Sequence, residues 1–456
     1  MALAECDPFP KRRAWKAVAL LAGFYAIAML DRVVLSMMIG PIKADLGIND
    51  FQVGLLIGLS FALTYVVCGV PFGLLADRFP RKWIILTGLL VWSAATIGCG
   101  FASGFLALFV MRMIVGIGEA ALSPAAIPLI TDMFPPEKRS LPLSLYQAAT
   151  HIGSAVALIS GGLLIDSLSH ASSRLELLGR GFYGWQMVFF IVGIPGCVLG
   201  LLAIALPEPR RSASALMPKQ IPSTSLPTRV WPFIARHKRL FFFFMLAFAA
   251  NVTVTYAFAY WSAEHLYRKL GWSKSEIGMT LGLLLLVPPF ISHVVTGTIV
   301  DRLTALRVDD APLRIFFWMA LVSLPFGILA YATASSMIAI VSLIALKLLL
   351  IPSLGLATTS LQLFTPTHLR GRVTGLFLSF VNFAGLAIGP ALVGFLTHYV
   401  WKDDTALGVV LSTIMGTGIS IICICLYFSL RPMRAAVADA RGIASEIAPT
   451  KVASKR

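Results

Sequence analysis

The sequence predicts an all-α polytopic membrane protein with twelve transmembrane helices arranged in two bundles of six. Three observations predict it. Hydrophobic residues make up 58% of the chain and charged residues only 13%. Apolar runs of membrane-spanning length recur along the whole chain, and a polar segment divides them six and six. A soluble protein carries roughly 25% charged residues and has no such series of runs, so a soluble fold with an oversized core is excluded.

Each apolar run is long enough to cross a bilayer, which takes about 20 residues. The first lacks a small-residue cleavage site and is too long for a signal peptide, so we expect it to remain as a helix. In chain order, and to within several residues at each end, the runs lie at 15–40, 51–76, 83–103, 105–133, 141–166, 185–206, 240–262, 276–300, 314–334, 337–364, 373–399 and 406–430.

The charge balance indicates membrane topology. The chain has 37 Lys and Arg against 21 Asp and Glu, and most of the basic residues lie in the termini and in alternate loops, as in "DRFPRK" and "RHKR". Cytoplasmic loops of membrane proteins are enriched in this way. We therefore expect a multi-pass protein of the inner or plasma membrane with both termini in the cytoplasm. The lipid bilayer is its expected surroundings, nucleic acid is not an expected partner, and a monomer is the expected functional form.

A linker and an internal repeat define the halves. Residues 207–239 are rich in Pro, Ser and basic residues without apolar periodicity, which is typical of a cytoplasmic linker. We expect bundles at 1–206 and 240–456. "GLLADRFPRK" follows the second run and "GTIVDRLTALR" follows the eighth, which is second in its own half. Parallel repeats of this kind are typical of transporters.

The loop motif carries a family resemblance. Its string from Gly73 to Lys82 resembles G-x-L-x-D-R-x-G-R-K of the major facilitator superfamily, with Pro80 at the second glycine. "RMIVGIGEAALSPAAIPLITDMF" and Leu30-Asp31-Arg32 resemble the spinster branch, whose members move sphingosine-1-phosphate, lysophospholipids or related amphipaths. The resemblance implies the major facilitator fold, alternating access and a cytoplasmic gate. The gate residues it implies are Gly73, Asp77, Arg78, Arg81 and Lys82, with Asp301 and Arg302 in the repeat.

Four charged residues lie deep in the predicted spans of the first half: Asp31, Arg32, Arg112 and Glu119. Each costs on the order of 2.5 kcal/mol or more at the centre of a membrane helix, so such residues are functional candidates. Arg112 and Glu119 are about two turns apart on one helix face, whereas Asp31 and Arg32 diverge by about 100°. We therefore expect a cross-helix cluster in which the two carboxylates meet the two arginines.

The two carboxylates are the groups of this cluster that can change charge. Burial favours the neutral form of a carboxylate and a nearby arginine favours the charged form, so a balanced carboxylate can load and release a proton. We expect Asp31 and Glu119 to couple transport to a proton gradient, and they are the only acidic residues we expect deep in a span. The family resemblance assigns the same positions to proton coupling and substrate control. The alternative is an ion cluster that only specifies helix packing.

Other polar residues in the spans are candidates for lining a cavity. Lys347 in the tenth run can bind a substrate anion or extend toward the membrane surface. The remaining candidates can line a cavity or form hydrogen bonds between helices. They are Gln147, His151, Asn251, Tyr256, His293 and Asn382.

Motifs for enzymatic activity are absent from the sequence. It has no nucleophile elbow, no H-E-x-x-H helix and no phosphate-binding P-loop. We expect no enzymatic activity, no metal site and no cofactor. Uphill transport would then draw on an ion gradient.

The sequence favours a secondary active transporter for a lysolipid-like or sphingoid amphipath. Charge concentrated in the first half and the apolar "LFFFFMLAFAANV" of the second suit a substrate with a head and a tail. One alternative is a carrier of small organic anions that bind Arg32 and Arg112. Another is a receptor or scaffold that does not transport, although such a protein needs neither a gate motif nor buried carboxylates.

The topology predicts a labelling pattern. Single cysteines replacing Ser172 and Ser214 should react with a membrane-impermeant maleimide from opposite sides of the membrane, Ser172 from outside and Ser214 from the cytoplasm. Labelling of both from one side would contradict the predicted orientation.

Overall fold

The computed structural model describes residues 10–135, 138–169, 175–177, 180–209, 226–366 and 369–447. Within these ranges the chain is mostly helical, and twelve helical segments are long and apolar enough to span a membrane. The predicted all-α fold class and number of spans are confirmed. Ser172, Ser214 and residues 210–225 of the predicted linker lie outside the described residues.

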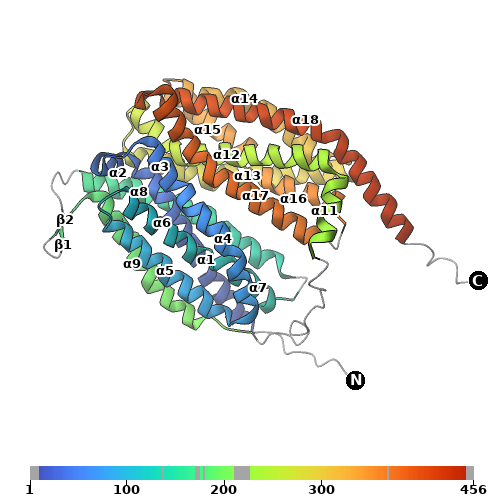
Figure 1. Cartoon of the computed structure of the whole chain (residues 1–456), viewed down its shortest axis with the longest axis horizontal. Helices are drawn as coiled ribbons and strands as arrows, with labels where there is room; N and C mark the ends of the chain where they lie inside the picture. Colours follow the sequence, from blue (N-terminus) through green and yellow to red (C-terminus); the bar gives the residue numbers. More distant parts are fainter. Residues whose placement is uncertain are drawn as a thin grey trace, which may run out of the picture. The chain divides into compact units, whose positions relative to one another are not determined.

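The first six spans are built from α1, α3–α4, α5, α6–α7, α8 and α9, which lie side by side in Figure 1. A short antiparallel hairpin, β1 with β2, precedes α9. The bounds are α1 Lys11–Val34, the 3₁₀ turn η1 Leu35–Met37, α2 Ile39–Leu46, α3 Asp50–Ile57, α4 Leu59–Arg78, α5 Arg81–Gly100, α6 Phe105–Glu119, α7 Leu122–Met133, α8 Ser140–Ser169, β1 Leu175–Leu177, β2 Arg180–Phe182, α9 Gly184–Gly200 and η3 Leu201–Ala205.

The last six spans are longer than the sequence predicted. The seventh runs to Leu270 and the eighth begins at Lys274, so residues assigned to a loop are helical. The bounds are α11 Leu226–Arg236, α12 Lys238–Leu270, α13 Lys274–Ala305, α14 Ala311–Ala332, α15 Ser336–Leu350, α16 Ser353–Phe364, α17 Arg370–Phe395, the π turn η4 Leu396–Trp401, the 3₁₀ turn η5 Asp404–Ala406 and α18 Leu407–Ile447.

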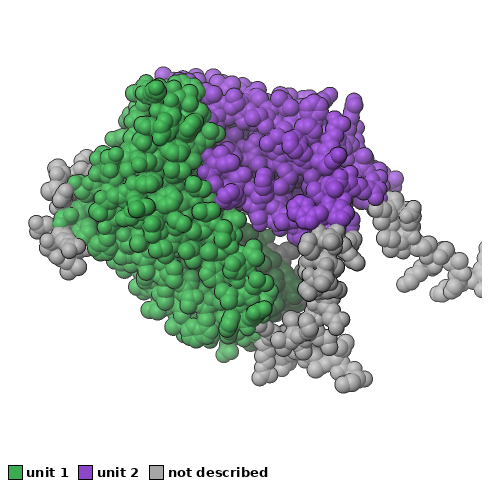
Figure 2. Space-filling model, viewed as in Figure 1, with its two compact units in different colours: residues 1–217, 259–286, 390–407 green, residues 218–258, 287–389, 408–456 purple. Residues whose placement is uncertain are grey.

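The chain forms two compact units (Figure 2). Unit 1 comprises Met1–Met217, Ala259–Leu286 and Pro390–Leu407, and unit 2 comprises the rest of the chain. Unit 1 thus contains the first six spans and the connected ends of α12, α13 and α17. The predicted division at 206 and 240 remains a prediction.

Glycines set the spacing between helices within unit 1. A Cβ on Gly88 of α5 would lie 2.7 Å from the carbonyl oxygen of Gly118 in α6. A Cβ on Gly116 would lie 2.8 Å from the carbonyl oxygen of Phe61 in α4. Small residues let membrane helices approach closely in this way, so α6 is held tightly between α4 and α5.

Two spans are interrupted at equivalent places. In the fourth span, α6 has 15 residues and α7 has 12; in the tenth, α15 has 15 residues and α16 has 12. Two residues separate the pieces in both. After each span an arginine Nε donates to the carbonyl oxygen five residues earlier, Arg139 to Phe134 at 3.0 Å and Arg370 to Thr365 at 3.1 Å. The structure therefore contains the internal repeat, and interrupted spans mark the functional regions of many transporters.

The tight packing of α5 against α6 predicts a stability effect. Gly88→Ala should lower the free energy of unfolding by about 1–3 kcal/mol, because the added methyl overlaps α6. The control is Gly69→Ala in α4, where nothing lies within 4 Å of an added Cβ. Thermal melts in detergent should show a lower melting temperature for the first variant only, and equal melts would contradict the packing argument.

Candidate functional site

The predicted charged cluster is present at the contact of α1 with α6 in unit 1. Arg32 Nε donates to Glu119 Oε2 at 2.6 Å, and Arg112 Nη1 lies 3.6 Å from Asp31 Oδ1. The cross-helix pairing expected from helix geometry is therefore observed. Glu119 is the last residue of α6, directly before the interruption of the fourth span.

Neighbouring polar and aromatic groups hold the cluster in place. Thr96 of α5 donates a hydrogen bond to Asp31 Oδ2. The Arg32 guanidinium carbon lies 4.3 Å from the ring centre of Phe61 and 4.6 Å from that of Tyr65. Aromatic faces attract a cation without neutralising it, so Arg32 is oriented from α4 and neutralised from α6.

Burial and charge balance define the electrostatics of the cluster. Asp31 and Arg112 are each 1% exposed and Glu119 is 2% exposed. Two carboxylates face two guanidinium groups, so the cluster is electrically neutral when both carboxylates are ionised. In a low-dielectric site this balance is what makes four charges tolerable.

The hydrogen bonding of the cluster is incomplete. Among the described residues, Asp31 Oδ1 and Glu119 Oε1 are buried without a hydrogen-bond partner, as are Nε and Nη1 of Arg112. A buried polar atom left without a partner costs free energy. Asp31 Oδ1 and Arg112 Nη1 are the two atoms of the 3.6 Å ion pair, so the unused hydrogen-bonding capacity of the cluster is at Glu119 Oε1 and Arg112 Nε.

The other sequence-predicted cavity residues are spread over several environments. Lys347 is 5% exposed, and its Nζ lies 4.2 Å from the ring centre of Phe258, so it does not extend to the surface. Asn251 is buried and donates to Ser353 Oγ at 2.6 Å. His151, Tyr256 and Asn382 are half-buried, and Gln147 and His293 are exposed. Gln147 and His151 belong to unit 1, and the other five belong to unit 2.

Part of the phenylalanine run of the seventh span is buried. Phe244 and Phe248 are fully buried and pack against Phe377, and Phe248 also stacks on Phe316. They form the core of unit 2. Phe242 of the same run is 62% exposed, and a run of equal hydrophobicity gives no sign of which side chains face the core.

The predicted gate residues lie at the ends of α4, α5 and α13. Asp77 and Arg78 are exposed at the end of α4, and Asp301 and Arg302 are exposed near the end of α13. Nothing lies within 4 Å of a Cβ added at Gly73. The structure places these residues at helix ends, as expected, and their role in gating remains a prediction.

The carboxylates that contact the start of α5 were missed by sequence reasoning. Glu208 accepts hydrogen bonds from the backbone N–H groups of Arg81 and Lys82, both at 3.1 Å. Arg81 Nη1 lies 2.5 Å from Asp132 Oδ2 at the end of α7. A carboxylate at a helix N-terminus is stabilised by the macrodipole, so Glu208 ties the end of the sixth span to the start of the third.

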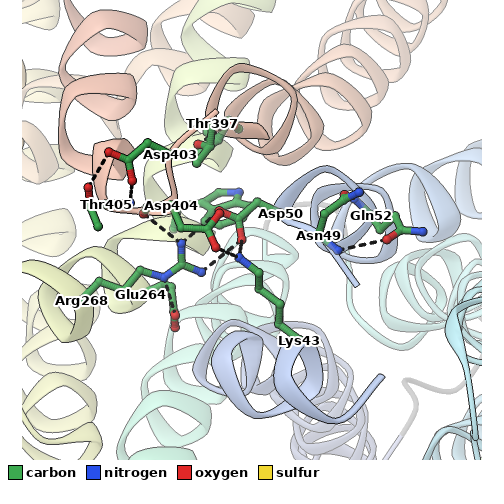
Figure 3. Close-up of polar contacts among 12 residues, drawn as sticks. Lys43, Asn49, Asp50, Gln52, Glu264, Arg268, Thr397, Asp403, Asp404 and Thr405 are labelled. Atoms are coloured by element: carbon green, nitrogen blue, oxygen red, sulfur yellow. Dashed lines mark hydrogen bonds and ion pairs between the residues drawn. The ribbon is translucent and has the colours of Figure 1, made fainter. Parts of the chain in front are cut away.

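A second ionic cluster, also missed, lies in unit 1 at the predicted extracellular ends of the spans (Figure 3). We call it the Asp50 network. Asp50 is fully buried and receives both terminal nitrogens of Arg268, at 3.0 and 3.1 Å, and Lys43 Nζ at 2.8 Å. Its members are Lys43, Asp50, Glu264, Arg268, Lys274 and Asp404.

The Asp50 network joins segments from both halves of the chain. Glu264 accepts from Arg268 Nε at 2.8 Å and Lys274 Nζ at 3.1 Å, and Lys43 also pairs with Asp404. Glu264 is 1% exposed. Glu264 is helical because α12 continues past the predicted end of the span, so burial of carboxylates is not confined to Asp31 and Glu119. The signal available in the sequence was the Glu264–Arg268 spacing of one helical turn.

The comparisons with known proteins define the class of the chain. The family model of the Major Facilitator Superfamily matches residues 21–390. An MFS-type efflux pump of Mycolicibacterium smegmatis is 29% identical over 442 residues, which cover 96% of this chain and 97% of that protein. Protein spinster of Drosophila melanogaster is 30% identical over 203 residues, 44% of this chain and 31% of that protein.

A solved structure shares the fold. A bacterial homologue of the human lysosomal transporter spinster, in an inward-facing and unoccupied conformation, aligns with a TM-score of 0.73 at 23% identity. The alignment covers 96% of this chain and 99% of that one. The chain belongs to the Major Facilitator Superfamily. The predicted resemblance to the spinster branch is also confirmed by these matches.

The Asp50 network predicts a conformational effect. Asp50→Asn should leave Lys43 and Arg268 without their shared counter-charge, which costs about 3–5 kcal/mol for a buried pair. Distances between spin labels on the exposed residues Phe101 and Lys402 should become longer and broader. Asp403→Asn is the control, because that exposed carboxylate bonds to Thr405 within its own turn. The same distance distribution in both variants would contradict a role for the network in holding these helix ends together.

Proposed function

We propose that this protein is a proton-coupled secondary transporter of an amphipathic, lysolipid-like or sphingoid substrate, working by alternating access. The observation that carries the proposal is the buried, charge-balanced cluster of α1 and α6 with its incomplete hydrogen bonding. A purely structural ion cluster gains nothing from buried oxygens that accept no hydrogen bond. A proton-binding site needs carboxylates whose charge can change, and burial beside arginines gives Asp31 and Glu119 that property.

The charge balance of the cluster indicates whether a substrate moves together with the proton or in exchange for it. With both carboxylates ionised the cluster is neutral, so protonating either leaves it with one excess positive charge. In a low-dielectric site that excess is costly, and an anionic group of the substrate would offset it. Proton binding and binding of an anionic substrate therefore favour each other, which corresponds to cotransport in one direction. A cationic substrate would compete with the proton, which corresponds to exchange.

The amphipathic substrate is supported by similarity rather than by the shape of the protein. The similar proteins include protein spinster, and the shared fold is that of a spinster homologue. A carrier of small organic anions is the second candidate, favoured by the unpartnered Nε–H group of Arg112. A receptor or scaffold that does not transport is disfavoured, because buried charges with unused hydrogen-bonding capacity would only destabilise it.

The proposed membrane location and energy source follow from the twelve spans and the charged cluster. Twelve spans fit a multi-pass protein of a bacterial inner membrane, with both termini in the cytoplasm and a functional monomer in the bilayer. The proton gradient is the proposed energy source, and no enzymatic step, metal or cofactor is needed for this mechanism.

The proposal predicts a separation of coupled from uncoupled transport. Asp31→Asn and Glu119→Gln should each reduce gradient-driven uptake into reconstituted vesicles about tenfold or more, since a tenfold change corresponds to only about 1.4 kcal/mol. Exchange of labelled for unlabelled substrate without a pH gradient should continue in at least one of them. The unmodified protein and Asp403→Asn should respond fully to the gradient.

Two controls make this result interpretable. Removing a buried carboxylate leaves an arginine unpaired, so each variant must first give a monodisperse, cooperatively melting sample. If both folded variants still respond fully to the gradient, neither carboxylate couples protons and the cluster is structural.

A further inference from the structure

The two halves carry a buried cation on equivalent interrupted spans, with different partners. The lengths of α6 and α15, the two-residue interruptions and the Arg139 and Arg370 contacts fix the register between the fourth and tenth spans. In that register Lys347 lies one helical turn beyond the position of Arg112. Residues four apart share a helix face, so Lys347 occupies the face that Arg112 occupies in the first half.

In each half, the residue that contacts the buried cation lies on the first helix. Both α1 and α12 begin with a Lys-Arg pair, and Asp31 and Phe258 are each the twentieth residue after that lysine. Asp31 is the residue that Arg112 approaches, and Phe258 is the residue on which Lys347 packs. The second half thus has a cation on the same face, with a phenyl ring where the first half has a carboxylate.

Lys347 is exceptional among the buried charges of the described residues. The others each form an ion pair with an oppositely charged side chain: Asp31, Asp50, Arg81, Arg112, Glu119, Glu264, Lys274 and Asp310. Within the described ranges Lys347 has no such partner, and its recorded contact is the ring of Phe258. An aromatic face attracts an ammonium group but does not neutralise it.

The depth of Lys347 excludes the alternative of reaching the membrane surface. It is the twelfth residue of a span of 29 residues, Ser336–Phe364, so it lies about 16 Å along the helix from the start of the span. Since a hydrocarbon core is about 30 Å thick, this is near its middle. A charged group retained at that depth is a functional candidate by default.

We propose that Lys347 binds the anionic group of the transported substrate, so that the substrate carries a phosphate or a carboxylate. This inference rests on the proposed transport function and narrows its substrate class. The missing carboxylate of the second half is supplied by the ligand. Lysophospholipid-like anions therefore fit Lys347, whereas free sphingoid bases, which are cations, do not.

Matched lipids test the proposal. Binding to the purified full-length protein in detergent is measured by microscale thermophoresis for lysophosphatidic acid, monoacylglycerol and sphingosine with equal chain lengths. Lys347→Met should weaken binding of lysophosphatidic acid about tenfold or more, as expected for loss of a charge-assisted hydrogen bond. Monoacylglycerol binding should change less than about threefold, and Lys347→Arg should retain most of the affinity for lysophosphatidic acid.

A second variant tests the same point without removing the lysine. Phe258→Asp restores at the equivalent position the carboxylate that Arg112 has in the first half, so it should pair with Lys347 and also weaken lysophosphatidic acid binding. Ser342→Ala on the same helix is the control, since Ser342 is buried and uncharged. This arm remains informative if Lys347→Met does not fold.

The outcomes separate this inference from the proposed function. Equal loss of anionic and neutral lipid in Lys347→Met, no loss of either, or preferential binding of sphingosine would overturn the role of Lys347. A fatty acid of the same chain length could bind in a Lys347-dependent way while lysophosphatidic acid does not bind. That result would support the anion site at Lys347 and contradict the assignment of a lysolipid as substrate. Failure of the Asp31 and Glu119 variants to lose coupling would remove proton coupling and leave this result unaffected.

Discussion

The constraint on which the structure depends is the cost of placing an ionised side chain where water does not reach it. Apart from Lys347, the buried charges of the described residues meet this cost by pairing, mostly with charges from other segments of the chain. The pairs are therefore also the contacts that join the segments: Arg32–Glu119 and Arg112–Asp31 join α1 to α6, and the Asp50 network joins α2 and α3 to α12. Because breaking either cluster exposes unpaired charge, each can take only a few discrete arrangements.

The two clusters of unit 1 differ in how completely their hydrogen bonds are made, and this difference suits different tasks. Asp50 receives three charge-assisted hydrogen bonds, including a bidentate pair from Arg268, which is the strong geometry for an arginine and a carboxylate. Such a site is suited to holding helix ends together. Asp31 and Glu119 each retain a buried oxygen without a hydrogen-bond partner, so their pairing can be altered by a single proton. Under the proposed function, the Asp50 network would hold helix ends together and Asp31 and Glu119 would carry the proton.

The sequence predicted the fold class, the number of spans and the cross-helix pairing of the four deep charges, because bilayer thickness and helix periodicity are both strong constraints. It did not reveal the Asp50 network. Glu264 and Lys274 lie beyond the predicted ends of their spans, and no local pattern connects Asp50 with Arg268, which is 218 residues away. The role of Glu208 at the start of α5 was missed for the same reason. Hydropathy gives the depth of a residue only to within several positions, and the burial of a charge at a helix end depends on partners far away in the sequence.

Comparison of the two repeats shows that their buried cations have different partners, which neither the sequence nor one half alone reveals. Equivalent interrupted spans carry a cation on the same face, and the partner is a carboxylate in the first half and a phenyl ring in the second. In the proposal, the counter-charge of Lys347 is the anionic group of the substrate. The carboxylates of one half would then handle the proton and the lysine of the other half the anion, and the charge balance of each half would depend on what it has bound.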